Sequence, residues 1–175
     1  MRMIPLTSEL ISTYNRVGTA SYHQHYLHLW PNEDPSQYIE SSFTPEVIDR
    51  EIKDSNLQHF LIEQQDEIAG ILKLIVDAPT YDFSRQEAIH LEKIYILEEH
   101  SGQGLGKKCI NFVIDLAESK GKKVLWLDTM KNGRALNFYL NLGFEIFGEK
   151  LLEFPNVHDD QRPMYKLRYS LGSKS

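Results

Sequence analysis

Three glycines within five positions constrain this chain more than any other feature of its sequence. Gly102, Gly104 and Gly106 follow an apolar run that ends at Leu97, and they precede a stretch with helical periodicity. The pattern predicts a strand, a tight loop and a helix start, in that order. Because glycine has no Cβ, backbone N–H groups in such a loop can approach a bulky anion closely. A helix N-terminus adds unpaired N–H donors and partial positive charge.

A lysine pair at the start of the predicted helix favours an anion at this loop. Lys107 and Lys108 occupy the first turn, where the helix dipole normally favours Asp or Glu. A phosphate or pyrophosphate on the loop would offset the unfavourable charge. The alternative is a solvated charged turn after an ordinary glycine loop.

Two common phosphate-binding patterns do not match the loop. The nucleotide pattern G-x-x-x-x-G-K-[ST] would require glycine in place of Ser101 and a hydroxyl in place of Lys108. The dinucleotide pattern G-x-G-x-x-G would require glycine in place of Lys107, and it would lie nearer the start of the chain.

The helix-capping, turn and strand signals in the rest of the chain predict one α/β domain at residues 1–170, followed by a disordered tail at 171–175. Thr44 is a suitable N-cap, and Pro45 suits the first helical position. Asp66-Glu67 reads as a hairpin turn. Helices are expected at 9–19, 44–54, 104–119 and 132–142, and strands at 59–64, 68–76, 88–97, 123–129, 144–152 and 164–169. This order implies a mixed sheet with helices on both faces.

Composition excludes several classes of protein. The chain has 175 residues, no apolar run of membrane-spanning length and no secretory leader pattern. The single cysteine, Cys109, cannot form an internal disulfide and suits a reducing compartment, so a cytoplasmic location is expected. Cys109 is expected to be a buried packing residue. The net charge of −6 argues against nucleic-acid binding. It would attract cationic amines, or it serves only solubility.

Two segments resemble the coenzyme motifs of the GNAT superfamily of N-acetyltransferases. The first is Leu91–Ile96 followed by Gly102–Gly106, and the second is Asn132–Phe144. The resemblance implies a GNAT-like α/β fold with a mixed, mostly antiparallel central sheet and helices on both faces. Within the family, the chain looks most like bacterial polyamine (spermidine/spermine) acetyltransferases. Ser101 stands where the family usually has Gln or Arg, which implies weaker coenzyme A binding at that point.

The resemblance assigns coenzyme roles to individual residues. It implies that the backbone of Ile94, Tyr95 and Ile96 pairs with the pantetheine arm after the strand splays from its neighbour. Asn132 and Ala135 would contact the coenzyme, although Asn132 could be only an N-cap. The loop that would hold the pyrophosphate comprises Gly102, Gln103, Gly104, Leu105, Gly106 and Lys107.

The chemistry of acetyl transfer suggests the catalytic candidates. An alkylamine is mostly protonated at neutral pH and must lose a proton before it can attack. The resemblance places Tyr139 near the thioester sulfur as the proton donor, while a packed tyrosine is the alternative. Glu92 lies in an otherwise apolar strand, where an unpaired carboxylate is costly, and it is the first candidate base. A salt bridge is the alternative role for Glu92, and His90 is the second candidate base.

An aromatic and histidine-rich stretch precedes Pro31 and Pro35. The resemblance places it in the acceptor pocket, where aromatic rings would suit a cationic amine. Simple packing of the rings is an equal alternative. The offsets of His23, His25 and His28 do not share one helix face, so no metal site is expected. The acceptor-binding candidates are Tyr22, His23, Tyr26, Trp30 and Tyr38.

The resemblance therefore implies transfer of an acetyl group from acetyl-CoA to a primary amine, by direct amine attack on the thioester. The expected acceptor is a small polyamine-like molecule, and a homodimer is possible. Two alternatives remain open: acetylation of a protein N-terminus or lysine, and a non-catalytic acetyl-CoA-binding module.

Overall fold

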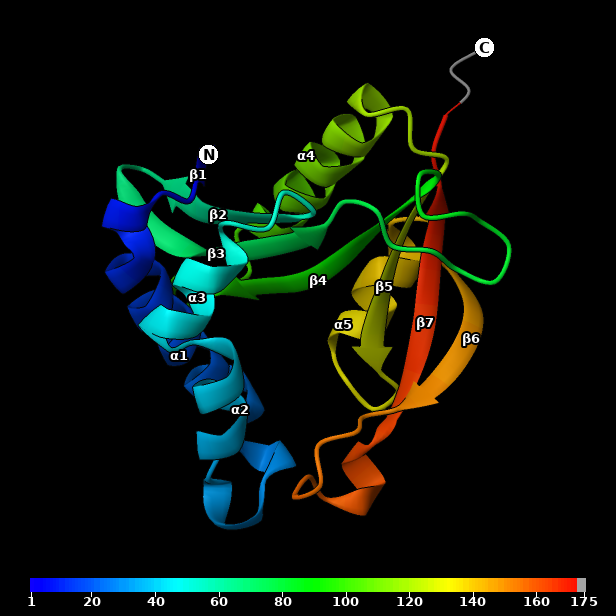
Figure 1. The fold of residues 1–175 in the computed structure, drawn as a ribbon. Helices are drawn as coiled ribbons and strands as arrows, with labels where there is room; N and C mark the ends of the chain where they lie inside the picture. Colours follow the sequence, from blue (N-terminus) through cyan, green and yellow to red (C-terminus); the bar gives the residue numbers. More distant parts are fainter. Residues whose placement is uncertain (173–175) are drawn as a thin grey trace. The chain divides into compact units, whose positions relative to one another are not determined.

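The computed structural model describes residues 1–172 and shows seven strands and five α-helices in that part of the chain (Figure 1). The strands are β1 (Arg2–Pro5), β2 (Leu57–Gln64), β3 (Glu67–Ile75), β4 (Ala88–Ile96), β5 (Val124–Met130), β6 (Glu145–Leu151) and β7 (Pro163–Ser170). The helices are α1 (Ile11–Tyr26), α2 (Ser36–Ser42), α3 (Pro45–Glu51), α4 (Leu105–Ser119) and α5 (Ala135–Asn141).

Hydrogen-bonded strand neighbours follow the order β1-β2-β3-β4-β5-β7-β6. The pairs β1–β2, β5–β7 and β6–β7 are antiparallel, whereas β4 and β5 are parallel. The β4–β5 ladder joins only Ala88–His90 to Val124–Trp126, although both strands continue beyond it. The predicted mixed sheet of the GNAT-like fold class is confirmed.

The chain divides into two compact units, and each is described by itself. Unit 1 comprises Met1–Leu74 and Lys93–Lys108, and unit 2 comprises Ile75–Glu92 and the chain from Cys109 onward. Each unit buries its own apolar side chains, which supply most of the folding free energy. Fully or almost fully buried in unit 1 are Tyr14, Phe43, Ile48, Ile62 and Leu72, and in unit 2 Ile89, Val113, Leu125, Leu127 and Leu167.

A buried charge network anchors α3 within unit 1. The carboxylate of Glu51 accepts hydrogen bonds from the Lys73 ammonium at 2.7 Å and from His59 Nε2 at 2.9 Å. Burial acts to raise the pKa of Glu51, but these two donors outweigh it and lower the pKa to about 2. The side chains of Lys73 and His59 are 5% and 1% exposed, so the pair is held away from water.

Local sequence signals explain several element boundaries. Thr44 Oγ1 accepts a hydrogen bond from the N–H of Val47, and α3 begins at Pro45, so the predicted cap is confirmed. The β2–β3 turn uses Gln65 and Asp66 at φ of 54° and 63°, one residue earlier than predicted. Two consecutive residues at positive φ give the turn the twist of the flanking strands. Strand β1 and helix α2 were not predicted.

The C-terminal boundary also differs from the prediction. Leu171, which was assigned to the tail, is 6% exposed, and its N–H donates to the carbonyl of Lys123 at 2.8 Å. Burial and a backbone hydrogen bond therefore extend the ordered chain past residue 170. Gly172 is also described, and residues 173–175 of the predicted tail lie outside the described residues.

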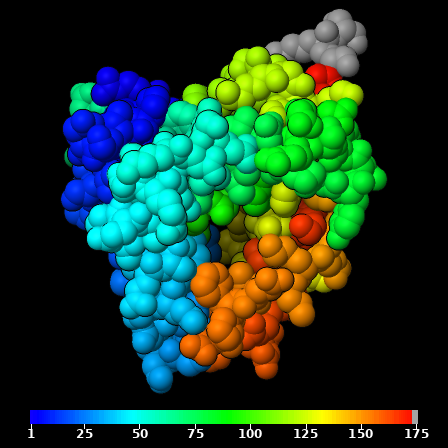
Figure 2. Space-filling view, viewed as in Figure 1, coloured from blue at the N-terminus to red at the C-terminus, as the bar shows by residue number. Residues whose placement is uncertain are grey.

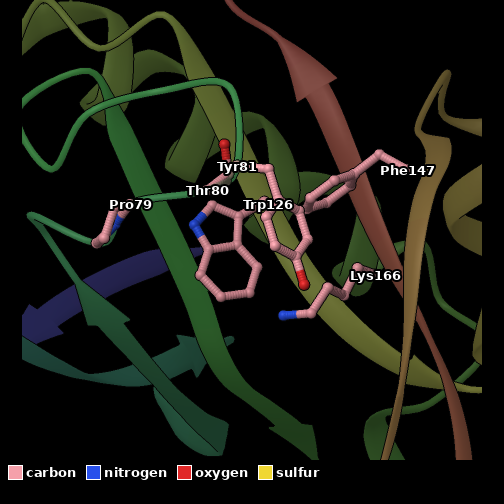
Figure 3. A pocket seen from close by; sticks show the side chains of 6 residues that line it. All are labelled: Pro79, Thr80, Tyr81, Trp126, Phe147 and Lys166. Atoms are coloured by element: carbon pink, nitrogen blue, oxygen red, sulfur yellow. The ribbon is translucent and has the colours of Figure 1, made fainter.

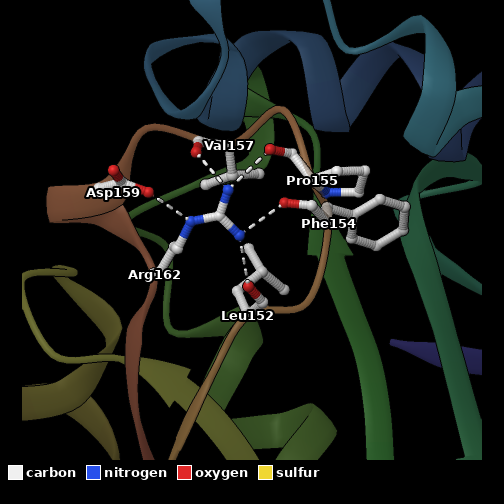
Figure 4. Close-up of polar contacts among 6 residues, drawn as sticks. All are labelled: Leu152, Phe154, Pro155, Val157, Asp159 and Arg162. Atoms are coloured by element: carbon white, nitrogen blue, oxygen red, sulfur yellow. Dashed lines mark hydrogen bonds and ion pairs between the residues drawn. The ribbon is translucent and has the colours of Figure 1, made fainter.

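One arginine organises the loop between β6 and β7 (Figure 4). Arg162 donates to the backbone carbonyls of Leu152, Phe154, Pro155 and Val157 at 2.7–3.1 Å. Its Nε donates to the carboxylate of Asp159 at 2.9 Å. All three guanidinium nitrogens are used, so a stretch without regular secondary structure is held in one conformation.

Candidate functional site

The glycine loop in unit 1 is open and adopts backbone conformations that glycine favours. Gly102 and Gly104 have φ of 73° and 74°, and a Cβ at either position would have no atom within 4 Å. Helix α4 begins directly after them, at Leu105. The loop itself is braced by Gln103, which bonds Gln64 and the carbonyl of Glu99, both at 3.1 Å. The space at the two glycines is therefore available to a ligand.

The charge at the loop is positive. Lys107 and Lys108 are exposed in the first turn of α4, and neither ammonium forms an ion pair with any residue in the described range 1–172. Uncompensated lysines at a helix N-terminus repel the helix dipole. A pyrophosphate would fit at this loop, because backbone N–H groups and two lysine ammonium groups could bind it and the space beside the glycines is open.

The end of β4 is pinned to α1 by two side chains. His25 Nε2 lies 2.9 Å from the carbonyl oxygen of Ile96, to which it donates, and Gln24 Oε1 accepts from the N–H of Glu98 at 2.9 Å. Strand β3 also approaches closely, since a Cβ at Gly70 would lie 2.3 Å from the Tyr95 carbonyl oxygen. These contacts fix the backbone where the strand passes into the glycine loop. No motif of the sequence indicated that His25, Gln24 or Gly70 contacts the end of this strand.

Four tyrosines form an aromatic cluster in unit 1. Tyr22 stacks on Tyr38 and on Tyr26, with ring centroids 4.2 and 5.0 Å apart, and the hydroxyls of Tyr38 and Tyr95 are 2.7 Å apart. Burial raises the pKa of Tyr22, Tyr26 and Tyr95, so these hydroxyls stay protonated at neutral pH. The structure thus brings together Tyr22, Tyr26 and Tyr38 from the predicted acceptor set.

The other two residues of that set are placed differently. Trp30 is 2% exposed, and its indole N–H donates to the Tyr22 hydroxyl at 3.0 Å, so it supports the cluster from within the core. His23 is exposed on α1. No group of three metal-ligating side chains is found anywhere in residues 1–172.

Unit 2 contains the remaining coenzyme candidates. Tyr139 lies on α5, is 7% exposed and contacts the rings of Phe138 and Phe144 at 5.2 and 5.5 Å. Helix α5 begins at Ala135, three residues later than predicted. Asn132 is therefore not its N-cap. Its side-chain amide instead donates to the carbonyl of Asp160, at 3.4 Å, in the loop that Arg162 organises.

The environment of Glu92, the first candidate base, differs from the prediction. Glu92 is exposed, so the expected cost of a buried carboxylate does not arise. The buried ionisable residue of this part of β4 is Lys93, at 8% exposure. His90 is 9% exposed and stacks on Trp126 with centroids 3.8 Å apart. Burial lowers the pKa of His90 to about 4, despite the nearby Asp128 and Glu92 carboxylates, so its imidazole is neutral at pH 7.

The lone cysteine and the helices complete the description of residues 1–172. Cys109 is fully buried as a free thiol, and burial raises its pKa to about 12, so the predicted packing role is confirmed. Among the helices of residues 1–172, none is long and apolar enough to cross a lipid bilayer.

Comparisons with known proteins identify the family of this chain. The Acetyltransferase (GNAT) family profile matches residues 19–144. An uncharacterised N-acetyltransferase of Lactobacillus delbrueckii subsp. lactis is 27% identical over 140 residues, which are 79% of either chain. Spermidine N(1)-acetyltransferase of Escherichia coli is 24% identical over 135 residues, 73% of this chain and 65% of that enzyme.

A solved structure has the same fold. A mutant of the spermidine N-acetyltransferase from Vibrio cholerae superposes with a TM-score of 0.70 at 18% identity, over 97% of this chain and 92% of that one. The family profile covers most of the chain and includes both predicted coenzyme motifs. The chain belongs to the GNAT acetyltransferase family and is an N-acetyltransferase.

Proposed function

We propose that the protein transfers the acetyl group of acetyl-CoA to a primary amine of a small polyamine-like molecule. The observation that carries the proposal is the open loop at Gly102 and Gly104, which leads into a helix with two lysines that form no ion pair within residues 1–172. Relatives named as spermidine acetyltransferases support the choice of acceptor, at 24% and 18% identity.

Several residues are proposed to hold the coenzyme. In unit 1, the N–H groups of the loop from Gly102 to Lys107 hold the pyrophosphate, and the backbone of Ile94–Ile96 holds the pantetheine arm. In unit 2, Asn132 and Ala135 contact the coenzyme. Acetyl-CoA supplies the activated acetyl thioester.

Proton transfer is assigned to two side chains of unit 2. Glu92, which is exposed to water, accepts the proton of the protonated amine, directly or through a water molecule. Tyr139 donates its hydroxyl proton to the departing thiolate sulfur. His90 is the weaker candidate base, because its lowered pKa makes it a poor acceptor for an alkylammonium proton.

The tyrosine cluster of unit 1 is proposed to take the cationic acceptor. Tyr26, Tyr38 and Tyr95 are each partly exposed and present ring faces and hydroxyls to a cation. Tyr22 and Trp30 support these rings from the buried side. His23 is exposed and follows Tyr22 on α1.

The test is thiol release from acetyl-CoA in the presence of spermidine, spermine, single amino acids, an aminoglycoside and a short peptide. Release stimulated by spermidine or spermine supports the proposal in full. Release with only another amine keeps acetyl transfer and removes the polyamine acceptor. Release only with the peptide would indicate a protein acetyltransferase. The cytoplasmic location and a homodimer stay predictions.

A further inference from the structure

A cavity in unit 2 lies outside all the residues assigned to acetyl transfer. Its volume is about 320 Å³, and it opens between the β3–β4 loop and the strands β5, β6 and β7 (Figure 3). In the space-filling view this loop (green) lies at the surface beside atoms of β6 and β7 (Figure 2). The residues that line this aryl pocket are Pro79, Thr80, Tyr81, Trp126, Phe147 and Lys166.

The aromatic wall of the aryl pocket is held rigidly. The Trp126 indole N–H donates to the Ala78 carbonyl at 2.9 Å, and the ring stacks on His90. Phe147 meets Trp126 edge to face, with centroids 6.4 Å apart at 88°. A wall that is already ordered loses little conformational freedom when a ligand binds.

The loop that forms the opposite wall is also fixed. Thr80 Oγ1 accepts hydrogen bonds from the N–H groups of Asp82 and Phe83, at 3.4 and 3.2 Å. Asp82 in turn accepts from Arg168 at 3.1 Å. Between these anchors, the Tyr81 side chain is 85% exposed, so a large ring is left in water at the pocket. A planar ligand would cover this ring and gain apolar contact.

The charged side chain that lines the pocket is Lys166, and the Asp128 carboxylate lies beside it. Lys166 places its ammonium 4.8 Å from the centroid of Trp126 and 3.8 Å from Asp128 Oδ1, which is too far for a hydrogen bond. The other oxygen of Asp128 accepts from Lys150 at 2.9 Å, so one carboxylate faces two ammonium groups. His90 is neutral and adds no charge. Within residues 1–172 the Lys166 ammonium makes no hydrogen bond, and its contacts are the ion pair with Asp128 at 3.8 Å and the Trp126 ring, so its N–H donors can still bind an anion.

We propose that the aryl pocket binds a small planar aromatic carboxylate. Its ring lies against Trp126 and Tyr81, and its carboxylate accepts a hydrogen bond from Lys166. The lysine at this site distinguishes it from the acceptor site, which is proposed to take a cationic amine. In this proposal the pocket is a second ligand site, and none of its lining residues is assigned to acetyl transfer, although Trp126 stacks on His90, the weaker candidate base.

The test is calorimetric titration of the full chain, without acetyl-CoA, using indole-3-acetate, indole-3-acetamide and tryptamine as probes. They share a ring and differ in charge. The carboxylate is expected to bind about tenfold more tightly than the amide, because it gains a charge-assisted hydrogen bond. Tryptamine is expected to bind most weakly. The indole N–H resonance of Trp126 should shift with the carboxylate probe.

Variants separate the charge from the ring contact. Lys166→Gln should remove the preference for the carboxylate over the amide, whereas Lys120→Gln, an exposed lysine on no pocket wall, should keep it. Tyr81→Ala should weaken both probes by a similar factor without unfolding the chain, because this side chain is exposed. The proposal is overturned if no probe binds at millimolar concentration, or if Lys166→Gln retains the preference.

Discussion

At the scale of single residues, one added Cβ tests the coenzyme loop. Gly104 and Gly121 have φ of 74° and 70°, and a Cβ at either would contact nothing within 4 Å. Alanine at either position should therefore lower the free energy of unfolding by about 1 kcal/mol, because a residue with a Cβ adopts positive φ less readily than glycine. Only Gly104→Ala should also raise the KM for acetyl-CoA, by about tenfold, because the methyl group occupies the space of the pyrophosphate.

Gly121→Ala is the matched control for that measurement. Thermal unfolding should show similar shifts for the two variants, and steady-state kinetics should separate them. An equal KM for acetyl-CoA in both variants would argue against coenzyme binding at this loop.

A substitution of Tyr139 tests whether its hydroxyl donates the proton to the thiolate. Tyr139→Phe keeps the ring that contacts Phe138 and Phe144 and removes only the hydroxyl. The expected result is a fall in kcat of about 100-fold with an unchanged KM for acetyl-CoA, since general-acid catalysis typically contributes that much. Tyr169→Phe, which alters another tyrosine packed on Phe144, should leave kcat unchanged. An unaltered kcat in Tyr139→Phe would remove this residue from the chemistry.

At the scale of elements, the contact between α1 and the end of β4 sets the entry to the coenzyme loop. His25→Leu removes the donor to the Ile96 carbonyl. It should raise the KM for acetyl-CoA about fivefold to tenfold, because one hydrogen bond no longer fixes the strand backbone. His25→Gln retains an N–H donor and should restore much of the affinity. His28→Leu, an exposed histidine beyond α1, is the control.

Comparing the KM values for the two substrates shows which site His25 serves. A change in the KM for acetyl-CoA that is larger than the change in the KM for the amine would identify His25 as a positioning residue for the coenzyme strand. A loss confined to the amine would instead assign His25 to the acceptor site. Fluorescence or calorimetric titration with coenzyme A, in the absence of amine, checks the same point.

At the scale of the whole molecule, the net charge of −6 should influence the encounter with a polycation. Raising the ionic strength from about 0.01 M to about 0.15 M shortens the Debye length from about 30 to 8 Å. The kcat/KM for spermidine should therefore fall several-fold, and that for a monoamine much less, because steering scales with the ligand's charge. Equal salt dependence for both amines would show that the acidic surface serves solubility alone.

The sequence by itself determined the parts of the protein whose conformation depends on near neighbours in the chain. Thr44 and Pro45 start α3 because a side-chain oxygen and a fixed φ act within one turn. Gly102 and Gly104 make the loop because few other residues adopt positive φ at low cost. The family resemblance rested on the same local motifs, and the family profile confirms it.

Only the tertiary structure decided features that depend on partners far apart in the chain. Glu92 was expected to be a costly buried charge, but the fold exposes it and buries Lys93 beside it. Short β1 exists because it pairs with β2, some 60 residues away, and its four residues carry no strand signal of their own. The His25 bond to Ile96 and the Trp126 stack on His90 likewise join distant positions. Composition and periodicity report local preference, whereas these contacts depend on which surfaces the folded chain brings together.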